Sequence, residues 1–367
     1  MKRNLKLLCL AILCVALLPI SGVFAATVDV GVVLPTREES RWLGDEAKFI
    51  KAIEEGGYNA RILFSEANSA TEKTNVETLL GLGAKTIVLC SFDATAAAAA
   101  VDMAAAEGAT VICYDRLIMD TKNLAYYVTF DSVKVSESQA QYLVDQIEPG
   151  SKGNNLYIYS GALTDNNSFL FLEGAWNILQ PYIADGTFVL RNCPKAEEFK
   201  DQPTLSYEEK VSIMQTIDTE WKMDVSKSLA EAHLTAVGSD AKGTVFVLGP
   251  ADDDCTRALS DAFHADADVT KVYIAGADGV AASVQYLIDG KQSMTVYKDP
   301  QALVDATFDI IGALKEGRVP ETNASFNNNA ADVPTIQCDV VTVTRDNLVE
   351  VFFEGGVYNG DDYVNWK

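Results

Sequence analysis

An aspartate and an arginine stand side by side at positions 115 and 116, directly after the apolar run 110–114. Such a run is typical of a buried strand, and ligands of open parallel α/β sheets bind outside the carboxyl ends of the strands. Asp115 offers acceptor oxygens and Arg116 offers a fork of donors. Together they suit a neutral, hydroxyl-rich molecule, because each hydroxyl both donates and accepts. The alternative interpretation is a surface ion pair of little energetic value.

Other polar residues follow predicted strands in both halves of the chain. They are Arg41 with Trp42, Asp131, Asp165 to Asn167, Asp252, Asp278 and Lys298. Acids outnumber bases in this set, which disfavours phosphate or carboxylate ligands. Aromatic rings can stack on the apolar faces of a sugar ring while polar groups bind its hydroxyls. The set therefore predicts a site for a small, neutral polyol.

The elements that must position these residues alternate along the chain. We predict strands at 28–34, 60–64, 86–90, 110–116 and 126–130, with helices at 42–55, 71–82 and 94–107. Strands that alternate with helices of 12–16 residues form βαβ units and a parallel sheet. After a helix at 133–146 the pattern restarts, with strands predicted at 156–160, 188–191, 243–248, 272–275 and 293–297. Residues 194–224 are the least regular part of the pattern.

This alternation of strands and helices predicts an α/β fold of two doubly wound, Rossmann-like parallel-sheet lobes. Their strand ends face each other, so the crevice between them is the expected site, and a few crossing segments can act as a hinge. The length of 367 residues agrees with roughly two domains. The net charge of −23 argues against nucleic acid and anionic membrane surfaces as partners.

Residues 1–25 have a different character. Lys2, Arg3 and Lys6 form a basic start, 7–20 is an apolar run, and 23–25 is a small-x-small cleavage signal. This is the pattern of a secretory signal peptide, so we expect cleavage near Ala25 and a soluble secreted protein. An uncleaved anchor is the alternative.

The spacing of the cysteines and histidines does not indicate a disulfide framework, a metal site or a catalytic triad. Five cysteines follow the predicted signal peptide, at positions 90, 113, 193, 255 and 338, with wide spacings that fit neither a disulfide framework nor a zinc site. The only histidines, His233 and His264, fall in or beside predicted helices, so no histidine-based triad is expected. The run 252–254 lacks the spacing of a calcium loop, and we expect one aspartate to point inward and two to lie in water. No metal, nucleotide or other cofactor is predicted, and the chain is not expected to be an enzyme.

Several motifs in a fixed order carry a family resemblance. They are Ser40-Arg41-Trp42, Tyr114-Asp115-Arg116-Leu117-Ile118, Thr129-Phe130-Asp131, Thr164-Asp165-Asn166-Asn167, Gly174 with Pro181-Tyr182-Ile183, and Met294-Thr295-Val296-Tyr297-Lys298. With them the chain resembles the type I periplasmic sugar-binding proteins of ABC transporters, in particular the xylose-binding and multiple-monosaccharide-binding branch. The resemblance runs over essentially the whole chain after residue 25.

The resemblance implies a monosaccharide ligand of the xylose, arabinose, glucose or galactose type, delivered to an inner-membrane permease by a monomeric protein. The residues it implies for sugar binding are Arg41, Trp42, Asp115, Arg116, Asp131, Asn167, Trp221, Asp252, Asp278 and Lys298, with Phe169 as an alternative to Trp221. It also implies three crossing segments near 131, 278 and 298. The lobes would then be 26–131 with 279–297, and 132–278 with 298–367.

Two departures from the family pattern bear on the ligand. Ser132 stands where an asparagine is usual, and Ala277 where a glutamine is usual, so fewer groups are available to bind hydroxyls. An unpaired hydroxyl costs on the order of 1–3 kcal/mol, which is enough to change the preferred monosaccharide. Other possibilities are a sensor subunit that presents the bound form to a chemoreceptor or sensor kinase, the same fold binding a furanone signal or nucleoside, and a secreted sugar-processing enzyme.

Overall fold

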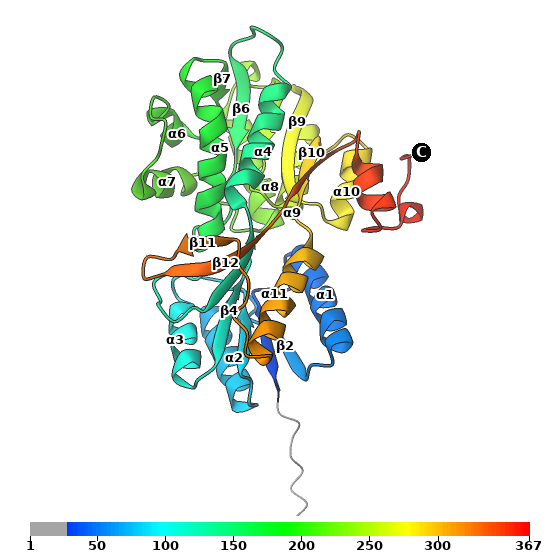
Figure 1. The fold of residues 1–367 in the computed structure, drawn as a ribbon. Coiled ribbons are helices and arrows are strands. Elements are labelled where there is room, and N and C mark those ends of the chain that lie inside the picture. The colour runs from blue at the N-terminus through cyan, green and yellow to red at the C-terminus, as the bar shows by residue number, and fades with distance from the viewer. Residues whose placement is uncertain (1–27) are drawn as a thin grey trace, which may run out of the picture.

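The computed structural model describes residues 28–367, which form two α/β lobes stacked end to end (Figure 1). The predicted signal peptide lies outside the described residues. Within 28–367 no helix combines the length and the apolar character needed to cross a membrane.

The N-terminal lobe is built on a seven-stranded sheet of order β11-β12-β5-β4-β3-β1-β2. Its strands are β1 (Val30–Leu34), β2 (Ala60–Phe64), β3 (Thr86–Leu89), β4 (Thr110–Tyr114), β5 (Tyr126–Phe130), β11 (Ala324–Asn327) and β12 (Asp332–Cys338). Its helices are α1 (Ser40–Gly56), α2 (Ser69–Gly81), α3 (Ala98–Ala106) and α11 (Pro300–Lys315). All strand pairs are parallel except β11 with β12.

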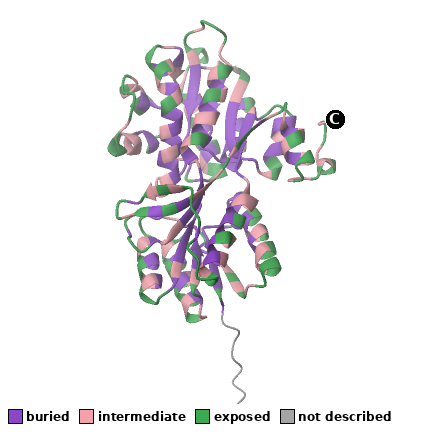
Figure 2. Ribbon diagram, in the orientation of Figure 1, coloured by how far each residue is buried: buried purple, intermediate pink, exposed green. Residues whose placement is uncertain are grey.

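Helices cover both faces of this sheet because successive strand residues point to opposite sides. On one face, Phe49 of α1 and Ile310 of α11 pack against Val32 of β1. On the other face, Leu79 of α2 packs against Val33 of β1 and the neighbouring strands. Figure 2 shows the strands buried between helices whose outer faces are exposed. These apolar runs, buried on both sides, are the physical basis of the doubly wound prediction.

The C-terminal lobe contains a six-stranded sheet of order β13-β10-β9-β8-β6-β7. Its strands are β6 (Asn154–Ile158), β7 (Phe188–Leu190), β8 (Gly243–Leu248), β9 (Val269–Asp278), β10 (Met294–Tyr297) and β13 (Val341–Thr344). Its helices are α4 (Ser132–Asp145), α5 (Asn166–Ala184), α6 (Pro194–Glu198), α7 (Tyr207–Met214), α8 (Met223–Ala236), α9 (Asp253–Ala265) and α10 (Ala281–Ile288). Only the β10–β13 pair is antiparallel. The two-lobe, doubly wound fold is therefore confirmed.

Helices α4 and α5 pack closely against one face of the second sheet, and α8 and α9 cover the other. Gly174 makes the contact between α4 and α5 possible, since a Cβ there would lie 2.1 Å from the Val133 carbonyl oxygen. The predicted irregular stretch 194–224 contains the two short helices α6 and α7, and α7 begins with a capping box formed by Ser206 and Glu209.

The chain crosses between the lobes three times, which agrees with the predicted number of segments. The crossings lie at Asp131 between β5 and α4, at residues 298–299 between β10 and α11, and at residues 339–340 between β12 and β13. The first two agree with prediction, whereas the third was expected at Asp278.

This topology corrects the predicted lobe boundaries. Residues 279–297 belong to the C-terminal lobe, because β10 pairs with β9 and β13. Residues 300–338 belong to the N-terminal lobe, because α11 packs on its sheet and β12 pairs with β5. The sequence pattern marked Asp278 correctly as a strand end, but the chain continues from it into α10 of the same lobe.

Candidate ligand-binding site

A small cavity of about 20 Å³ lies between the facing strand ends of the two lobes. It is lined by Glu39, Arg41, Trp42, Asp115, Arg116, Asp165, Asn167, Phe171, Trp221, Ala251, Asp252, Asp278 and Lys298. Of the ten residues that the resemblance implied for sugar binding, Asp131 alone is not in this set. Its charged side chains are buried and interact directly across the crevice, so the lobes are closed on each other.

The Asp115-Arg116 pair stands at the end of β4, as predicted. Asp115 has a φ of 61°, an uncommon conformation for a residue with a side chain, and this turns the chain sharply after Tyr114. The turn is held by the Asp115 N–H, which donates to Val128 O at 2.8 Å, and by the Tyr127 hydroxyl, which donates to Asp115 O at 2.7 Å. Neighbouring strand β5 therefore fixes the pair that faces the cavity.

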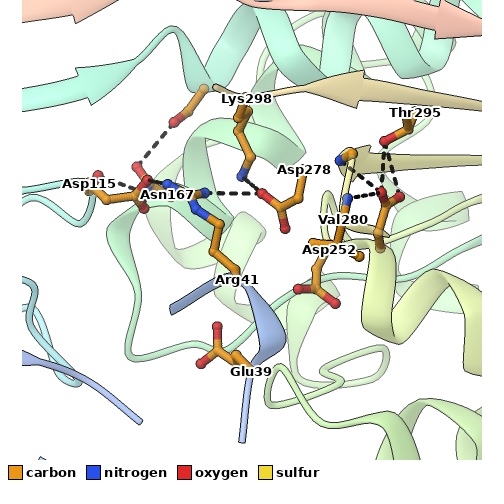
Figure 3. A network of polar contacts seen from close by, with 12 residues as sticks. Glu39, Arg41, Asp115, Asn167, Asp252, Asp278, Val280, Thr295 and Lys298 are labelled. Carbon is orange, nitrogen blue, oxygen red and sulfur yellow. Dashed lines mark hydrogen bonds and ion pairs between the residues drawn. The ribbon is translucent and has the colours of Figure 1, made fainter. Parts of the chain in front are cut away.

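Arg41, in the first turn of α1, lies at the centre of a network of carboxylates (Figure 3). Its Nε lies 2.9 Å from Asp45, and its Nη2 lies 2.8 Å from Asp115. Its Nη1 reaches across the crevice to Asp278 at 3.1 Å. Asp278 also binds the Lys298 ammonium at 2.8 Å. One arginine thus ties together both lobes and the crossing segment that carries Lys298.

Asp115 is held in its charged form. Burial alone would raise its pKa, but the positive charges of Arg41, Lys298 and Arg116 outweigh burial and lower the pKa below its usual range. The Asn167 amide donates across the crevice to the Asp115 carbonyl oxygen at 3.0 Å. Asp115 is therefore an acceptor-only group, suited to receive hydrogen bonds from ligand hydroxyls.

Arg116 makes the second set of contacts between the lobes. Its Nη2 lies 2.8 Å from Glu39 of its own lobe, and its Nε lies 3.0 Å from Asp165 of the other. The guanidinium carbon is 4.9 Å from the Trp42 ring centroid and 5.9 Å from that of Trp221. The Arg116 guanidinium thus lies near one indole from each lobe.

Aromatic rings come from both lobes. Trp42 belongs to α1, whereas Phe171 and Trp221 come from the C-terminal lobe, with their ring centroids 6.3 Å apart. Trp221 has a φ of 57°, and its ring lies against Gly161, where a Cβ would come within 2.0 Å of the indole. The backbone at two places is therefore adapted to hold this indole at the cavity wall. Phe169, the predicted alternative, instead stacks on Tyr207.

The three consecutive aspartates at the start of α9 are all buried, which corrects the prediction that two of them lie in water. Asp252 faces the cavity and caps α9, accepting from Cys255 N at 2.6 Å. It has no ion pair within the described chain, and burial together with Asp278 and Asp254 raises its pKa well above the usual range.

Asp253 and Asp254 use the same helix start to bind other segments. Asp253 accepts from the backbone N–H groups of Gly279 and Val280 at 2.8 and 3.2 Å, and so fixes the turn after Asp278. Burial and the Asp278 carboxylate raise the pKa of Asp253 to about 7. Asp254 accepts from the Ser40 N–H of the other lobe at 2.9 Å. These partners come from distant parts of the chain, so the local sequence could not reveal them.

Asp131 lies outside the cavity lining. Its carboxylate accepts from Lys134 N at 2.9 Å and caps α4, next to the first crossing segment. The following residue, Ser132, donates its hydroxyl to the Asn167 side-chain oxygen at 3.1 Å. Ser132 therefore orients Asn167 from behind the cavity.

Glu39, Phe171 and Ala251 line the cavity but were not predicted, whereas Asp165 was among the polar residues at strand ends but not among those that the resemblance implied. Asp165 is the N-cap of α5, in the same loop as Asn167. Phe171 follows Asn167 by four residues on α5, so helical spacing would have indicated it. Glu39 precedes the Ser40-Arg41-Trp42 motif, and only its contact with Arg116 distinguishes it.

No histidine or cysteine of the described residues lines this cavity, although Cys113 donates its thiol to the Arg116 carbonyl oxygen at 2.8 Å from behind it. His233 packs beside Tyr159, and burial lowers the pKa of its imidazole. The five cysteines within residues 28–367 are free thiols, and four of them are buried. Over the same residues no cluster of three or more histidine, cysteine or acidic side chains is arranged to hold a metal ion.

The chemistry of the cavity is that of a binding site for a neutral polyol. Its lining holds five carboxylates and three cations, so an additional negative charge would be disfavoured. Within residues 28–367, all of these charged groups except Asp252 are fixed by ion pairs, which leaves them oriented before a ligand arrives. Aromatic surfaces from both lobes supply platforms for a sugar ring.

Comparison with known proteins agrees with this geometry. Residues 30–318 match the family described as the periplasmic binding protein domain. The multiple sugar-binding periplasmic receptor ChvE of Rhizobium radiobacter is 29% identical, over 98% of this chain and 99% of that protein. The D-xylose-binding periplasmic protein of Escherichia coli is 27% identical, over 91% of this chain and 92% of its own length.

Solved structures give the same result. A carbohydrate transporter solute-binding protein from Chloroflexus aurantiacus, in complex with D-glucose, superposes with a TM-score of 0.90 at 48% identity. The match covers 93% of this chain and 99% of that one. An ABC transporter solute-binding protein from Clostridium phytofermentans with bound β-D-glucose gives a TM-score of 0.81 at 26% identity, over 90% and 98% of the two chains. These similar proteins are sugar-binding transport proteins, not enzymes. The chain therefore belongs to the periplasmic binding protein family.

Proposed function

We propose that this chain is the solute-binding protein of an ABC transporter and carries one neutral monosaccharide in the cavity between its lobes. The observation that carries the proposal is the network around Arg41, Asp115 and Arg116, which joins both lobes at the facing strand ends and is flanked by an indole from each. Such a network supplies fixed donors and acceptors for hydroxyls and fixed faces for a pyranose ring.

The ligand class follows from charge and from the relatives. The excess of carboxylates favours a neutral sugar over a sugar acid or phosphate. Two similar structures contain glucose, and one similar protein is a xylose-binding protein, so aldohexoses and aldopentoses of these types are the first candidates. Ser132 binds Asn167 rather than the cavity, which leaves Asn167 as the amide that reaches toward the ligand.

The proposal extends to location and partners. Residues 1–25 would direct the chain to the periplasm, where the monomeric closed form would be presented to an inner-membrane permease. Ligand binding and closure are linked, because a ligand that contacts both lobes stabilises the closed state. A second role as a sugar sensor, presented to a chemoreceptor or sensor kinase, is favoured by the similarity to a protein described as a receptor.

The experiment is thermal unfolding of residues 26–367 with a panel of monosaccharides at millimolar concentration. A ligand at a thousand times its Kd stabilises the folded protein by about 4 kcal/mol, so a bound sugar raises Tm by several degrees. Asp115→Ala and Arg116→Ala should abolish the shift. Asp309→Ala, on the exposed face of α11, should leave it unchanged. A panel without any shift would contradict the proposal, and nucleosides and furanones would then be tested.

A further inference from the structure

A second space adjoins the candidate site on the side of Trp221. This outer cavity has a volume of about 260 Å³, compared with about 20 Å³ for the site itself. The two spaces share Glu39, Arg116 and Trp221 as lining residues, so they adjoin each other on the two sides of these side chains. A ligand in the inner cavity could therefore extend past these three side chains.

Both lobes form the outer cavity. The N-terminal lobe contributes Phe92, which follows β3, and the C-terminal lobe contributes Ala162 and Leu163, which follow β6. The lobes touch directly beside it, since the Ala94 N–H donates to Thr164 O at 2.9 Å. The outer cavity is thus present while the lobes are closed, and closure does not require the ligand to fit entirely inside the inner cavity.

The Trp221 side chain lies between the inner and the outer cavity and lines both of them. It is only 9% exposed, and its ring position depends on the absence of a side chain at Gly161. Its indole Nε1 is buried without a hydrogen-bond partner in the described chain. A buried donor without an acceptor is costly, so a polar ligand atom beside this indole would be stabilising.

The walls of the outer cavity again suit a neutral polyol. Phe92 and Trp221 supply aromatic surface, and Leu163 adds an aliphatic one. The lining contains more acids than bases, with Glu38, Glu39, Asp218 and Glu220 against Arg116 and Lys222. Lys222 is paired with Glu220 at 2.9 Å. A uronate or phosphate would meet repulsion here, whereas a sugar hydroxyl can bind the carboxylates.

We propose that the site accepts a sugar ring that carries a neutral glycosidic substituent, such as a second sugar unit, with the substituent in the outer cavity. This inference rests on the proposed function, because the first ring must occupy the inner cavity. It widens the ligand class from free monosaccharides to disaccharides and simple glycosides.

Isothermal titration tests the inference with glucose, xylose, the methyl and p-nitrophenyl α- and β-glycosides of both, and maltose, cellobiose and gentiobiose. We expect at least one substituted sugar to bind with a Kd within tenfold of its parent monosaccharide. The inference is overturned if the monosaccharide binds but every substituted sugar binds more than tenfold more weakly than its parent. If no monosaccharide binds either, the proposed function itself fails.

Two variants locate the substituent. Ala162→Trp fills the outer cavity and should weaken the substituted sugar at least thirtyfold while the monosaccharide Kd changes less than twofold. Phe92→Ala removes an aromatic wall and should weaken the substituted sugar severalfold, again without effect on the monosaccharide. If both variants leave the substituted sugar unaffected, or weaken both ligands equally, the outer cavity is not where the substituent lies.

Discussion

Asp252 and Asp278 are buried carboxylates of the same cavity, but in the described part of the molecule Asp278 is paired with two cations and Asp252 with none. Replacement by asparagine should therefore change the free energy of unfolding in opposite directions at the two positions. Asp278 binds Arg41 at 3.1 Å and Lys298 at 2.8 Å, and it is the only ion-pair partner of Lys298 within the described chain. Removing one member of a buried pair typically costs about 3–5 kcal/mol, because the other charge remains buried. Asp278→Asn should therefore lower the free energy of unfolding by an amount of this order.

Asp252→Asn should instead stabilise the ligand-free protein. Asp252 has no cation to lose, and asparagine can keep the cap on α9 by accepting from Cys255 N. Relief of an unpaired buried charge is worth on the order of 1–3 kcal/mol. The same substitution should weaken sugar binding, because it removes an acceptor from the cavity.

The pH dependence gives the sign of the Asp252 effect. Its pKa is raised in the folded protein, so its contribution to stability is fully present below the unfolded value of about 4 and is lost as pH rises through the folded value. The stabilisation by Asp252→Asn should therefore grow with pH above about 4 and vanish below it.

Urea unfolding of the sugar-free protein between pH 4 and 8 measures both variants, with Asp309→Asn on the surface of α11 as the matched control. The control should stay within about 0.5 kcal/mol of wild type. The reasoning is refuted if Asp252→Asn destabilises the protein at pH 8, or if Asp278→Asn is as stable as wild type.

Three further substitutions test other contacts. Gly161→Ala should displace the Trp221 ring, which would lie 2.0 Å from the new Cβ, and should weaken sugar binding at least tenfold by titration; an unchanged Kd would show that the ring does not contact the ligand. Asp254→Ala removes the bond to Ser40 across the crevice, so the sugar-free protein should open, with a larger radius of gyration in X-ray scattering and a severalfold weaker Kd; an unchanged radius would contradict this role. Gly174→Ala should force α4 and α5 apart and lower the free energy of unfolding by about 1–3 kcal/mol in urea, and a loss below 0.5 kcal/mol would mean the helices can adjust.

Most of the fold was predictable because its signals are local. Most strands of the parallel core are short apolar runs followed by a helix, so the alternation of strands and helices indicated two doubly wound lobes. The polar residues after those runs, such as Asp115 and Asp278, were placed correctly because the carboxyl ends of parallel strands meet at one edge.

The local sequence pattern could not predict that residues 279–297 belong to the C-terminal lobe and residues 300–338 to the N-terminal lobe. β11 and β12 contain few large apolar residues, and β12 joins the first sheet by pairing with β5, some two hundred residues earlier. The identity of each lobe is therefore set by pairing between distant strands.

Burial of acidic residues was likewise hidden from the sequence. A run of three aspartates is typical of a solvated helix start. In the folded chain, however, Asp253 is buried and accepts hydrogen bonds from Gln292 and Thr295. Asp254 is also buried and accepts from Ser40 and Arg257. Only the folded chain brings those donors together.

The central claim is that one neutral monosaccharide binds between the lobes, and a crystal structure grown with millimolar D-glucose tests it most directly. The account predicts density for one pyranose in the cavity between Trp42 and Trp221, with ring hydroxyls within hydrogen-bond distance of Asp115 and Arg116. An empty cavity, or a sugar bound elsewhere on the molecule, would contradict it.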